Sequence, residues 1–414
     1  MDADKEYDDL IKHIKRMGKF ISIWPLERDP PTNLIAISVA VTVDLVRNIN
    51  DLDNLTACAL MASTTYLSII RLTVFSTHQK DMLYVVETMK KDWVCSSYED
   101  KAFLKEKCLF AFRVAKCFLI MVTITTFFFG CSPVLEFSRN CLLPLHKCSG
   151  RTLTWRIVFR WSFRFTSLSK TPAQLRTRTL RKRMHFLGKE RMFPCRGYFF
   201  ANQMVSPFYE LLYVFNIMAA VFSSSTIMGA TTFNFVAVTH GSVKFALLRR
   251  KLELINNNDP DVDGAMVDCI KDHQDAITFA DTLERIVNIL TLAQFVISSG
   301  MLCFAGFQIT AMVKNEERLM QYIMYLSAAI LELFMFSFSG NLLIDESNAV
   351  GESAYCSCWI GSTFGRSLQI VMMRSKVPSK ITAAKFYSMS LESFARVLSA
   401  SFSYIMVLLS RKEH

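Results

Sequence analysis

One face of the last predicted helix, 385–410, carries hydroxyl groups interrupted by a branched aliphatic side chain. At helical steps of three and four, its members are Arg396, Ser399, Ser403, Val407 and Ser410. Hydroxyl groups can line a water-filled pore, and a ring of aliphatic side chains can close a pore by dewetting. The pattern therefore predicts a pore-lining face with Val407 at the gate. The alternative is that these serines only contact neighbouring helices, since a serine can also bond the carbonyl four residues before it. The other side offers apolar side chains for packing: Leu398, Phe402, Ile405 and Leu409.

Side chains that commonly carry out catalysis or bind metals are present but are not grouped. The 12 cysteines form no C-x-x-C pair, and Cys356 with Cys358 is a single C-x-C without a second ligand pair. His273 lies in a helical stretch, where a structural role is expected. The sequence shows no nucleophile–base pair, phosphate-binding loop or metal cluster. We therefore predict neither an enzyme nor a metal or cofactor site.

The composition indicates the elements that must position the serine-lined helix. Of 414 residues, 51% are hydrophobic, with 34 Phe and 21 Met but only 10 Pro and 14 Gly. Long apolar runs with few turn formers are typical of a helical membrane protein, in which each span needs roughly 20 residues. We predict an all-α fold with seven membrane spans: 33–46, 55–70, 117–135, 211–243, 286–313, 319–344 and 397–410.

Charge predicts the orientation of these spans. An odd number of spans puts the two termini on opposite sides, and Lys and Arg gather in 1–32, 76–116 and 244–285. The positive-inside rule places these segments, and the amino terminus, in the cytoplasm. Helical periodicity continues on both sides of "NNNDPDVDG" in 244–285, which predicts a cytoplasmic anchor built from extensions of the fourth and fifth spans. The segment 345–384 is expected on the same side, and the sequon at Asn54 outside.

A basic segment does not follow this rule. Residues 141–192 hold 13 Lys and Arg and one acid, a charge of +12, so the rest of the chain sums to −1 against the total of +11. In the predicted topology this segment, centred on 145–190, is external. It is either a lip that binds an acidic partner or lipid headgroups, or an insertion or mispredicted exon with no settled structure. External cysteines that flank it are permitted to pair: Cys131, Cys141, Cys148 and Cys195. The sequence shows no soluble domain that would carry this basic segment, so we do not predict nucleic-acid binding.

The carboxyl-terminal part resembles a known signature. "GNLLIDESNAVGESAYCSCW" is followed by a Pro-x-x-Ile-Thr-Ala-x-Lys-Phe run at 378–386 and by a Ser-Tyr pair in "SASFSYIMVLLS". With "ISIWPLE", "DLDNLT" and "SPFYELLYVFN" nearer the start, this pattern resembles the insect odorant receptor family. The likeness covers the chain apart from about 145–190.

The resemblance implies an assembly and a function. In that family, four subunits surround a central cation pore lined by the last helix, and the cytoplasmic helices hold the subunits together. The short connection between spans four and five looks like that of a ligand-tuning subunit, which forms a heterotetramer with a common co-receptor subunit. The plasma membrane of olfactory dendrites is the implied location. The resemblance also puts Val407 at the aliphatic gate, whereas Arg411 stands where a second aliphatic residue is common.

The resemblance further implies a pocket for volatile odorants in the outer half of spans two, three, four and six. The matching positions are Met61, Thr64, Thr65, Thr126, Phe127, Gly130, Tyr213, Ile217, Met218, Tyr322 and Tyr325. The two tyrosines are three residues apart and share a face, so that their rings and hydroxyls can both contact a ligand. Glu332 lies deeper in the same span and is a second kind of candidate, because acids within membranes are commonly functional. Ordinary helix packing is the alternative for each of these positions.

Two other receptor classes are alternatives. A G-protein-coupled receptor also has seven helices, but its amino terminus is generally external, and this chain has no Asp-Arg-Tyr after span three and no Asn-Pro-x-x-Tyr in span seven. A gustatory receptor shares the predicted architecture and differs mainly in its ligand. The ending "SMSLESFARVLSASFSYIMVLL" favours the odorant branch.

Overall fold

The computed structural model describes residues 32–47, 50, 52–146, 205–255, 261–312, 316–357 and 359–413, and these are almost wholly helical. The helices are α2 (Thr32–Arg47), α3 (Leu52–Thr77), α4 (Gln79–Cys95), α5 (Tyr98–His146), α8 (Phe208–Leu254), α9 (Val262–Ala311), α10 (Glu316–Cys356), α11 (Gly365–Ser375) and α12 (Leu391–Glu413). A two-stranded hairpin, β1 (Thr382–Ala383) and β2 (Tyr387–Ser388), precedes α12. The predicted all-α class is confirmed.

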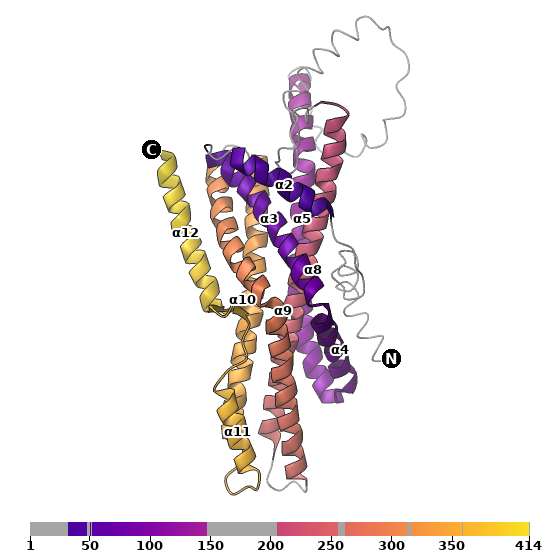
Figure 1. The fold of residues 1–414 in the computed structure, drawn as a ribbon, viewed down its shortest axis with the longest axis vertical. Coiled ribbons are helices and arrows are strands. Elements are labelled where there is room, and N and C mark those ends of the chain that lie inside the picture. Colours follow the sequence, from indigo (N-terminus) through magenta and orange to yellow (C-terminus); the bar gives the residue numbers. More distant parts are fainter. Residues whose placement is uncertain are drawn as a thin grey trace, which may run out of the picture.

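The longest helices extend far beyond the thickness of a bilayer. The 47 residues of α8 and the 50 of α9 span roughly 70 and 75 Å at 1.5 Å per residue, whereas the hydrocarbon core is about 30 Å thick. Figure 1 shows α8, α9 and α10 running the height of the molecule. We call the lower half α4, α11, the start of α5 and the segments 240–255, 261–285 and 341–356. The upper half holds α2, α3, α12 and the remaining parts of the long helices.

Six described helices are long and apolar enough to cross a membrane: α3, α5, α8, α9, α10 and α12. The remaining predicted span, 33–46, corresponds to α2, whose 16 residues reach only about 24 Å. It packs on the bundle through Val41, which is buried beside Ala62 of α3 and Ala219 of α8. One predicted boundary is wrong. The span 55–70 was expected to end before Arg71, but α3 continues to Thr77 because Arg71 is buried inside the bundle.

The lower half is a packed helical platform. As predicted, the helices continue on both sides of the "NNNDPDVDG" break, and Asp261 caps α9 by accepting a hydrogen bond from the Gly264 N–H at 3.2 Å. Side chains from α4, α8, α9, α10 and α11, with the end of α3 and the start of α5, form one buried cluster that includes Val85, Leu252, Phe279, Val350 and Leu368. His273 packs edge-on against Phe245, in keeping with its expected structural role.

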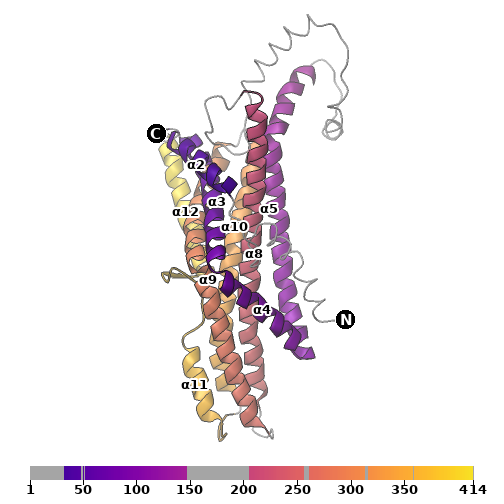
Figure 2. The same cartoon turned by 45° about the vertical axis from the view of Figure 1, so that its right-hand side comes forward.

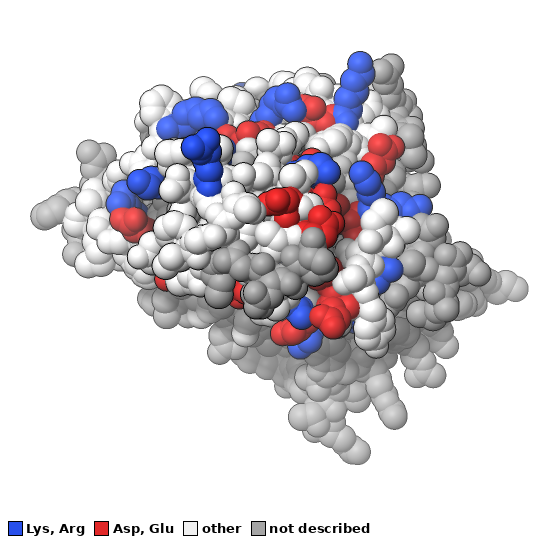
Figure 3. Space-filling view, turned by 90° about the horizontal axis from the view of Figure 1, so that it is seen from below, with Lys and Arg blue, Asp and Glu red and all other residues white. Residues whose placement is uncertain are grey.

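Charged side chains surround this platform. Seen from below in Figure 3, Lys and Arg alternate with Asp and Glu over the lower end. Several are paired: Arg249–Glu346, Arg250–Glu99, Lys251–Asp272 and Arg285–Asp81. A surface of paired charges suits water rather than lipid.

Asp92 of α4 joins that helix to α8. Its carboxylate accepts hydrogen bonds from His240 at 2.9 Å and from Lys244 at 2.8 Å. Burial pushes the pKa of Asp92 upward, but the hydrogen bond and charge of His240 and the charge of Lys244 outweigh it and hold the pKa below its usual value. The ionised carboxylate therefore stabilises the contact between α4 and α8.

The last helix begins later than predicted. It was expected from Lys385, but Ala384 and Lys385 have φ of 47° and 66° and form the turn of the hairpin. Left-handed backbone cannot continue into a right-handed helix. The helix starts after Ser390, whose hydroxyl accepts a hydrogen bond from the Ser393 N–H at 3.3 Å. Gly340 permits this route, since a Cβ there would lie 2.5 Å from the Met389 carbonyl oxygen.

Predictions for the basic segment fall largely outside the described residues. The residues outside the described part of the chain include 147–192, Cys195 and Cys358, and the structure gives no side-chain position for Cys131 or Cys141. The alternatives for the segment and for disulfides therefore stay predictions.

Candidate functional site

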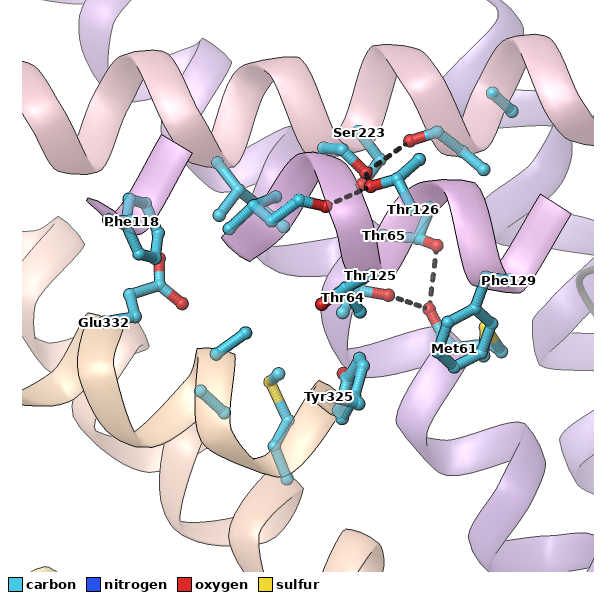
Figure 4. A pocket seen from close by; sticks show the side chains of 18 of the residues that line it. Met61, Thr64, Thr65, Phe118, Thr125, Thr126, Phe129, Ser223, Tyr325 and Glu332 are labelled. Carbon is cyan, nitrogen blue, oxygen red and sulfur yellow. Dashed lines mark hydrogen bonds between the residues drawn. The ribbon is translucent and has the colours of Figure 1, made fainter. Parts of the chain in front are cut away.

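A cavity of about 120 Å³ lies in the upper half of the bundle. Its walls come mainly from α3, α5, α8 and α10, with Val41 of α2 and Met301 of α9 completing them. Figure 4 shows Glu332 and Phe118 at one end, Met61 and Phe129 at the other, and hydroxyl side chains between them. An apolar cavity with a few convergent polar groups is the usual form of a small-molecule site.

The hydroxyl wall joins three helices. Thr126 of α5 donates to Ser224 of α8 at 2.7 Å, and Ser68 of α3 lies 2.7 Å from Ser223 of α8. Short side chains at these positions let the helices approach while keeping polar groups paired. The cavity therefore lies beside a fixed set of interhelical hydrogen bonds.

The deep end of the cavity is a buried charged network. Arg71 of α3 donates to Glu332 of α10 and to Gln294 of α9. Thr231 of α8 donates to the same Glu332 oxygen at 2.7 Å, and Gln294 donates to Ser298 at 2.8 Å. The side chains of Arg71 and Glu332 are 0% and 5% exposed. Charges this far from water need a partner and further hydrogen bonds. Four helices supply them to Arg71 Nη2 and Glu332 Oε1, whereas Arg71 Nε and Nη1 are buried without a hydrogen-bond partner among the described residues.

The structure brings five of the eleven predicted pocket residues to this cavity. Those that line it are Met61, Thr64, Thr65, Thr126 and Tyr325. The six outside its lining are Phe127, Gly130, Tyr213, Ile217, Met218 and Tyr322. Phe127 and Met218 are 66% and 61% exposed on the outside of the bundle. The Tyr213 hydroxyl donates to the Gly130 carbonyl at 2.8 Å and ties α8 to α5. Binding of a ligand by the five lining residues stays a prediction.

Sequence reasoning missed several lining and neighbouring residues. Phe118, Phe129, Ser223, Ser224 and Met301 line the cavity but were not selected. Arg71 was read as the end of a span. The signal for it was the single acid in span six, because one buried charge requires an opposite charge on another helix.

The serine face of α12 is exposed in the single chain. Its members Ser399, Ser403, Val407 and Ser410 all point away from the bundle, and Val407 is 57% exposed. The helix packs instead through Val397 and Ser401, which are buried, and through Ile405, which lies against Gly306 of α9. The prediction that Phe402 lies on the packing side is wrong, since its side chain is 67% exposed. Figures 1 and 2 both show α12 at the edge of the upper half.

An apolar cluster connects the cavity to α12. Met301, Tyr325 and Ala329 line the cavity and also pack in the cluster that contains Val397 of α12. Phe394 and Leu398 of α12 pack against the same cluster. Side chains of the cavity wall are therefore in direct contact with the packing face of the last helix.

The described residues hold no group of three His, Cys, Asp or Glu that could bind a metal ion. The lining of the cavity contains no cysteine, histidine or lysine. The prediction that the chain is not an enzyme agrees with the names of its relatives, which are those of receptors.

A bundle of membrane-length helices around a small pocket is the architecture of a multi-pass membrane receptor. The family model described as the 7tm odorant receptor matches residues 151–402, more than half of the chain. The chain therefore belongs to the insect odorant receptor family.

Curated relatives match over part of their length. Putative odorant receptor 92a of Drosophila melanogaster is 31% identical over 138 residues, 33% of this chain and 33% of that protein. Odorant receptor 13a of the same organism is 28% identical over 223 residues, 49% and 53% of the two chains. The odorant receptor coreceptor of Aedes aegypti is 30% identical over 145 residues, 34% and 30%. The chain thus spans about half, or less, of the relatives it matches.

The fold has a solved counterpart. The insect olfactory receptor OR5 from Machilis hrabei, in complex with eugenol, superposes with a TM-score of 0.70 at 16% identity and covers 98% of this chain and 99% of that chain. The likeness shows the fold, which is the predicted seven-helix membrane fold.

Proposed function

We infer that this chain is the ligand-tuning subunit of an odorant-gated, non-selective cation channel. A volatile ligand occupies the cavity between α3, α5, α8 and α10, and the α12 helices of the assembled subunits line the pore. The solved counterpart, OR5 from Machilis hrabei, is in complex with eugenol, which supports a small organic ligand for this chain.

The observation that carries this proposal is the shared cluster of the cavity and α12. Met301, Tyr325 and Ala329 belong to both the cavity wall and the cluster around Val397. A ligand that moves these side chains changes the packing of α12 without a long relay. Differential contacts of this kind are what a ligand needs to shift a two-state equilibrium.

The exposed face of α12 supports an assembly. A membrane helix with hydroxyl groups on one face and Val407 among them is better placed at a wet pore than in lipid. Similarity to an odorant receptor coreceptor over 34% of the chain supports the proposed heterotetramer with a co-receptor subunit. In that assembly, four side chains of this face line the pore: Ser399, Ser403, Val407 and Ser410.

Charge supports the proposed orientation. The basic connections 76–116 and 244–285 both belong to the lower half, where ion pairs surround the helical platform. We place this half and the amino terminus in the cytoplasm as the anchor between subunits. The plasma membrane of olfactory dendrites is the corresponding location.

The test is whole-cell current from cells that express this chain with and without a co-receptor subunit during an odorant panel. We expect an odour-evoked cation current that needs both subunits and no G-protein signalling. Tyr325→Ala should shift the response, whereas Tyr322→Ala, three residues earlier and outside the cavity lining, serves as the matched control. Absence of current with every odorant, despite delivery to the cell surface, would contradict the proposal.

A further inference from the structure

The hydroxyl groups that line the cavity have already committed their protons. Each hydroxyl has one proton to donate. Of the six serine and threonine hydroxyls, four donate to a carbonyl of their own helix at 2.8 to 2.9 Å: Thr64 and Thr65 to Met61, Thr125 to Met121 and Ser224 to Ala220. The proton of Thr126 is committed either to the Val122 carbonyl at 2.8 Å or to the Ser224 oxygen at 2.7 Å. What these side chains leave for a ligand is their lone pairs.

The sixth hydroxyl, Ser223, is also committed. Ser68 gives its proton to the Thr64 carbonyl at 2.8 Å, so in the 2.7 Å contact between the two serines it is Ser223 that donates. Tyr325 has the remaining hydroxyl in the lining and directs it to the Leu60 carbonyl at 3.5 Å. The middle of the cavity is therefore lined by hydrogen-bond acceptors.

The deep end adds the strongest acceptor. An ionised carboxylate accepts hydrogen bonds and donates none. Both donors to Glu332, Arg71 and Thr231, use its Oε1, and within the described part of the chain Oε2 receives no hydrogen bond. Glu332 lines the cavity, whereas Arg71 is fully buried behind it. A ligand thus meets a carboxylate oxygen and none of the guanidinium N–H groups.

We propose that this cavity selects small neutral ligands with an apolar body and a hydrogen-bond donor, namely alcohols or phenols, over ketones, esters and ethers of the same skeleton. A hydroxyl can donate to Glu332 or to the threonine oxygens. A carbonyl or ether oxygen faces other acceptors and loses its hydrogen bonds to water without replacement.

The ion pair explains the preference for neutral donors. Arg71 already balances the charge of Glu332, so an ammonium ligand would add an uncompensated charge in a buried site. The inference rests on the proposed function, because it names the ligand class of the same cavity. Its test therefore measures binding without any channel current.

The experiment measures thermal stabilisation of the purified full-length chain in detergent by ligands that share one carbon skeleton. Each set holds an alcohol, its methyl ether, the matching ketone and the primary amine, together with a phenol and its methyl ether. We expect the alcohol and phenol to bind about tenfold more tightly than their ethers and ketones. Equal or tighter binding of ethers and ketones, or no binding by any member of the sets, would overturn the proposal. Current through the channel is recorded separately and decides only the proposed function.

Variants locate the selectivity in the wall. Thr64→Val with Thr125→Val removes two acceptors while keeping the side-chain shape, and the preference for alcohol over ether should fall at least about threefold. Thr73→Val is the matched control, because Thr73 is an exposed threonine of α3 that makes the same bond to its own helix at 2.9 Å. An unchanged preference in the double variant contradicts the role of these threonines. Glu332→Gln supplies a donor and should improve ketone binding relative to alcohol, and the threonine pair keeps the test valid if this variant fails to fold.

Discussion

The lower half of the molecule is closed by apolar packing, whereas the upper half contains a cavity, a buried ion pair and a helix attached along one narrow face. Among the described side chains of α12, only Ser393, Val397 and Ser401 are buried. The lower cluster joins seven helices through large side chains such as Phe245 and Phe279, both 0% exposed. The upper clusters are smaller and border the cavity.

This difference suggests that the lower half is a rigid scaffold and that the upper half is the part that changes conformation. Close-packed cores transmit strain and resist small displacements, while regions with fewer buried contacts change shape at lower cost. In the proposed channel, the lower half holds the subunits in place and the upper half responds to the ligand. Substitutions in the two halves should therefore affect different measurements.

The largest effect is expected from breaking the ion pair of the upper half. Arg71→Met leaves Glu332 charged and buried without its partner, which typically costs about 3–5 kcal/mol. We expect loss of surface delivery and of thermal stability in detergent, measured by surface biotinylation and by unfolding of the purified chain. Glu332→Leu alone should be similarly damaging.

The double variant and a second ion pair serve as controls. Arg71→Met with Glu332→Leu removes both charges and should restore delivery. Arg396→Met breaks the exposed pair with Glu392 on α12, whose side chains are 61% and 73% exposed, and should change stability by no more than about 1 kcal/mol. If the single and double variants fold equally well, the pair does not stabilise the upper half.

A comparable loss should follow from opening the core of the lower half. Phe279→Ala removes a fully buried ring that lies against Gly241 and His240, at a cost of about 3–5 kcal/mol. Because the lower half is the scaffold, we expect lower thermal stability with an unchanged order of ligand preference among the channels that reach the surface. Phe386→Ala, at an 82% exposed position of the hairpin turn, is the control. A change in ligand selectivity would show that the halves are not separate in function.

A smaller, pH-dependent effect is expected at Asp92. Asp92→Asn weakens two charge-assisted hydrogen bonds to α8, each worth about 1.5–3 kcal/mol. Because the folded-state pKa of Asp92 lies below the usual 3.8, its stabilisation is present above that value and is lost as the pH falls through the folded-state pKa. The gap in melting temperature between wild type and variant should be constant from about pH 7 to about pH 5 and narrow under more acidic conditions. A gap that already narrows near neutral pH would point to another titrating group.

Much of the fold followed from hydrophobic runs and charge. The break before Val262 and the extension of α8 to Leu254 were predicted, because the turn residues and the periodicity agree there. The start of α12 was not, since Ala384 and Lys385 are good helix formers. The hairpin is held by the buried side chains of Ile381 and Met389 and by hydrogen bonds of Thr382 and Lys385 to Glu284 of α9. Tertiary contacts override local propensity at such positions.

The site was less predictable than the fold. Sequence spacing put Tyr322 and Tyr325 on one face, but only Tyr325 lines the cavity, because the face is wider than the cavity wall. The acceptor character of the wall depends on where each hydroxyl proton goes, as for Ser223 and Ser68. Such geometry lies between helices that are distant in the sequence, and spacing along one helix cannot supply it.

The smallest effect on folding, and the sharpest test of the moving part, is expected at Val407. Its side chain is 57% exposed in the single chain, so Val407→Ala should change stability by no more than about 0.5 kcal/mol. At a pore gate, however, the smaller side chain widens the constriction and favours wetting, and we expect a higher current in the absence of odorant. Met406→Ala on the neighbouring face, at a position that is 66% exposed, is the matched control. Whole-cell recordings that show equal basal currents for the two variants would remove Val407 from the gate. A leak confined to Val407→Ala would instead identify the exposed face of α12 as the pore, because the opposite face is already packed against the wall of the ligand cavity.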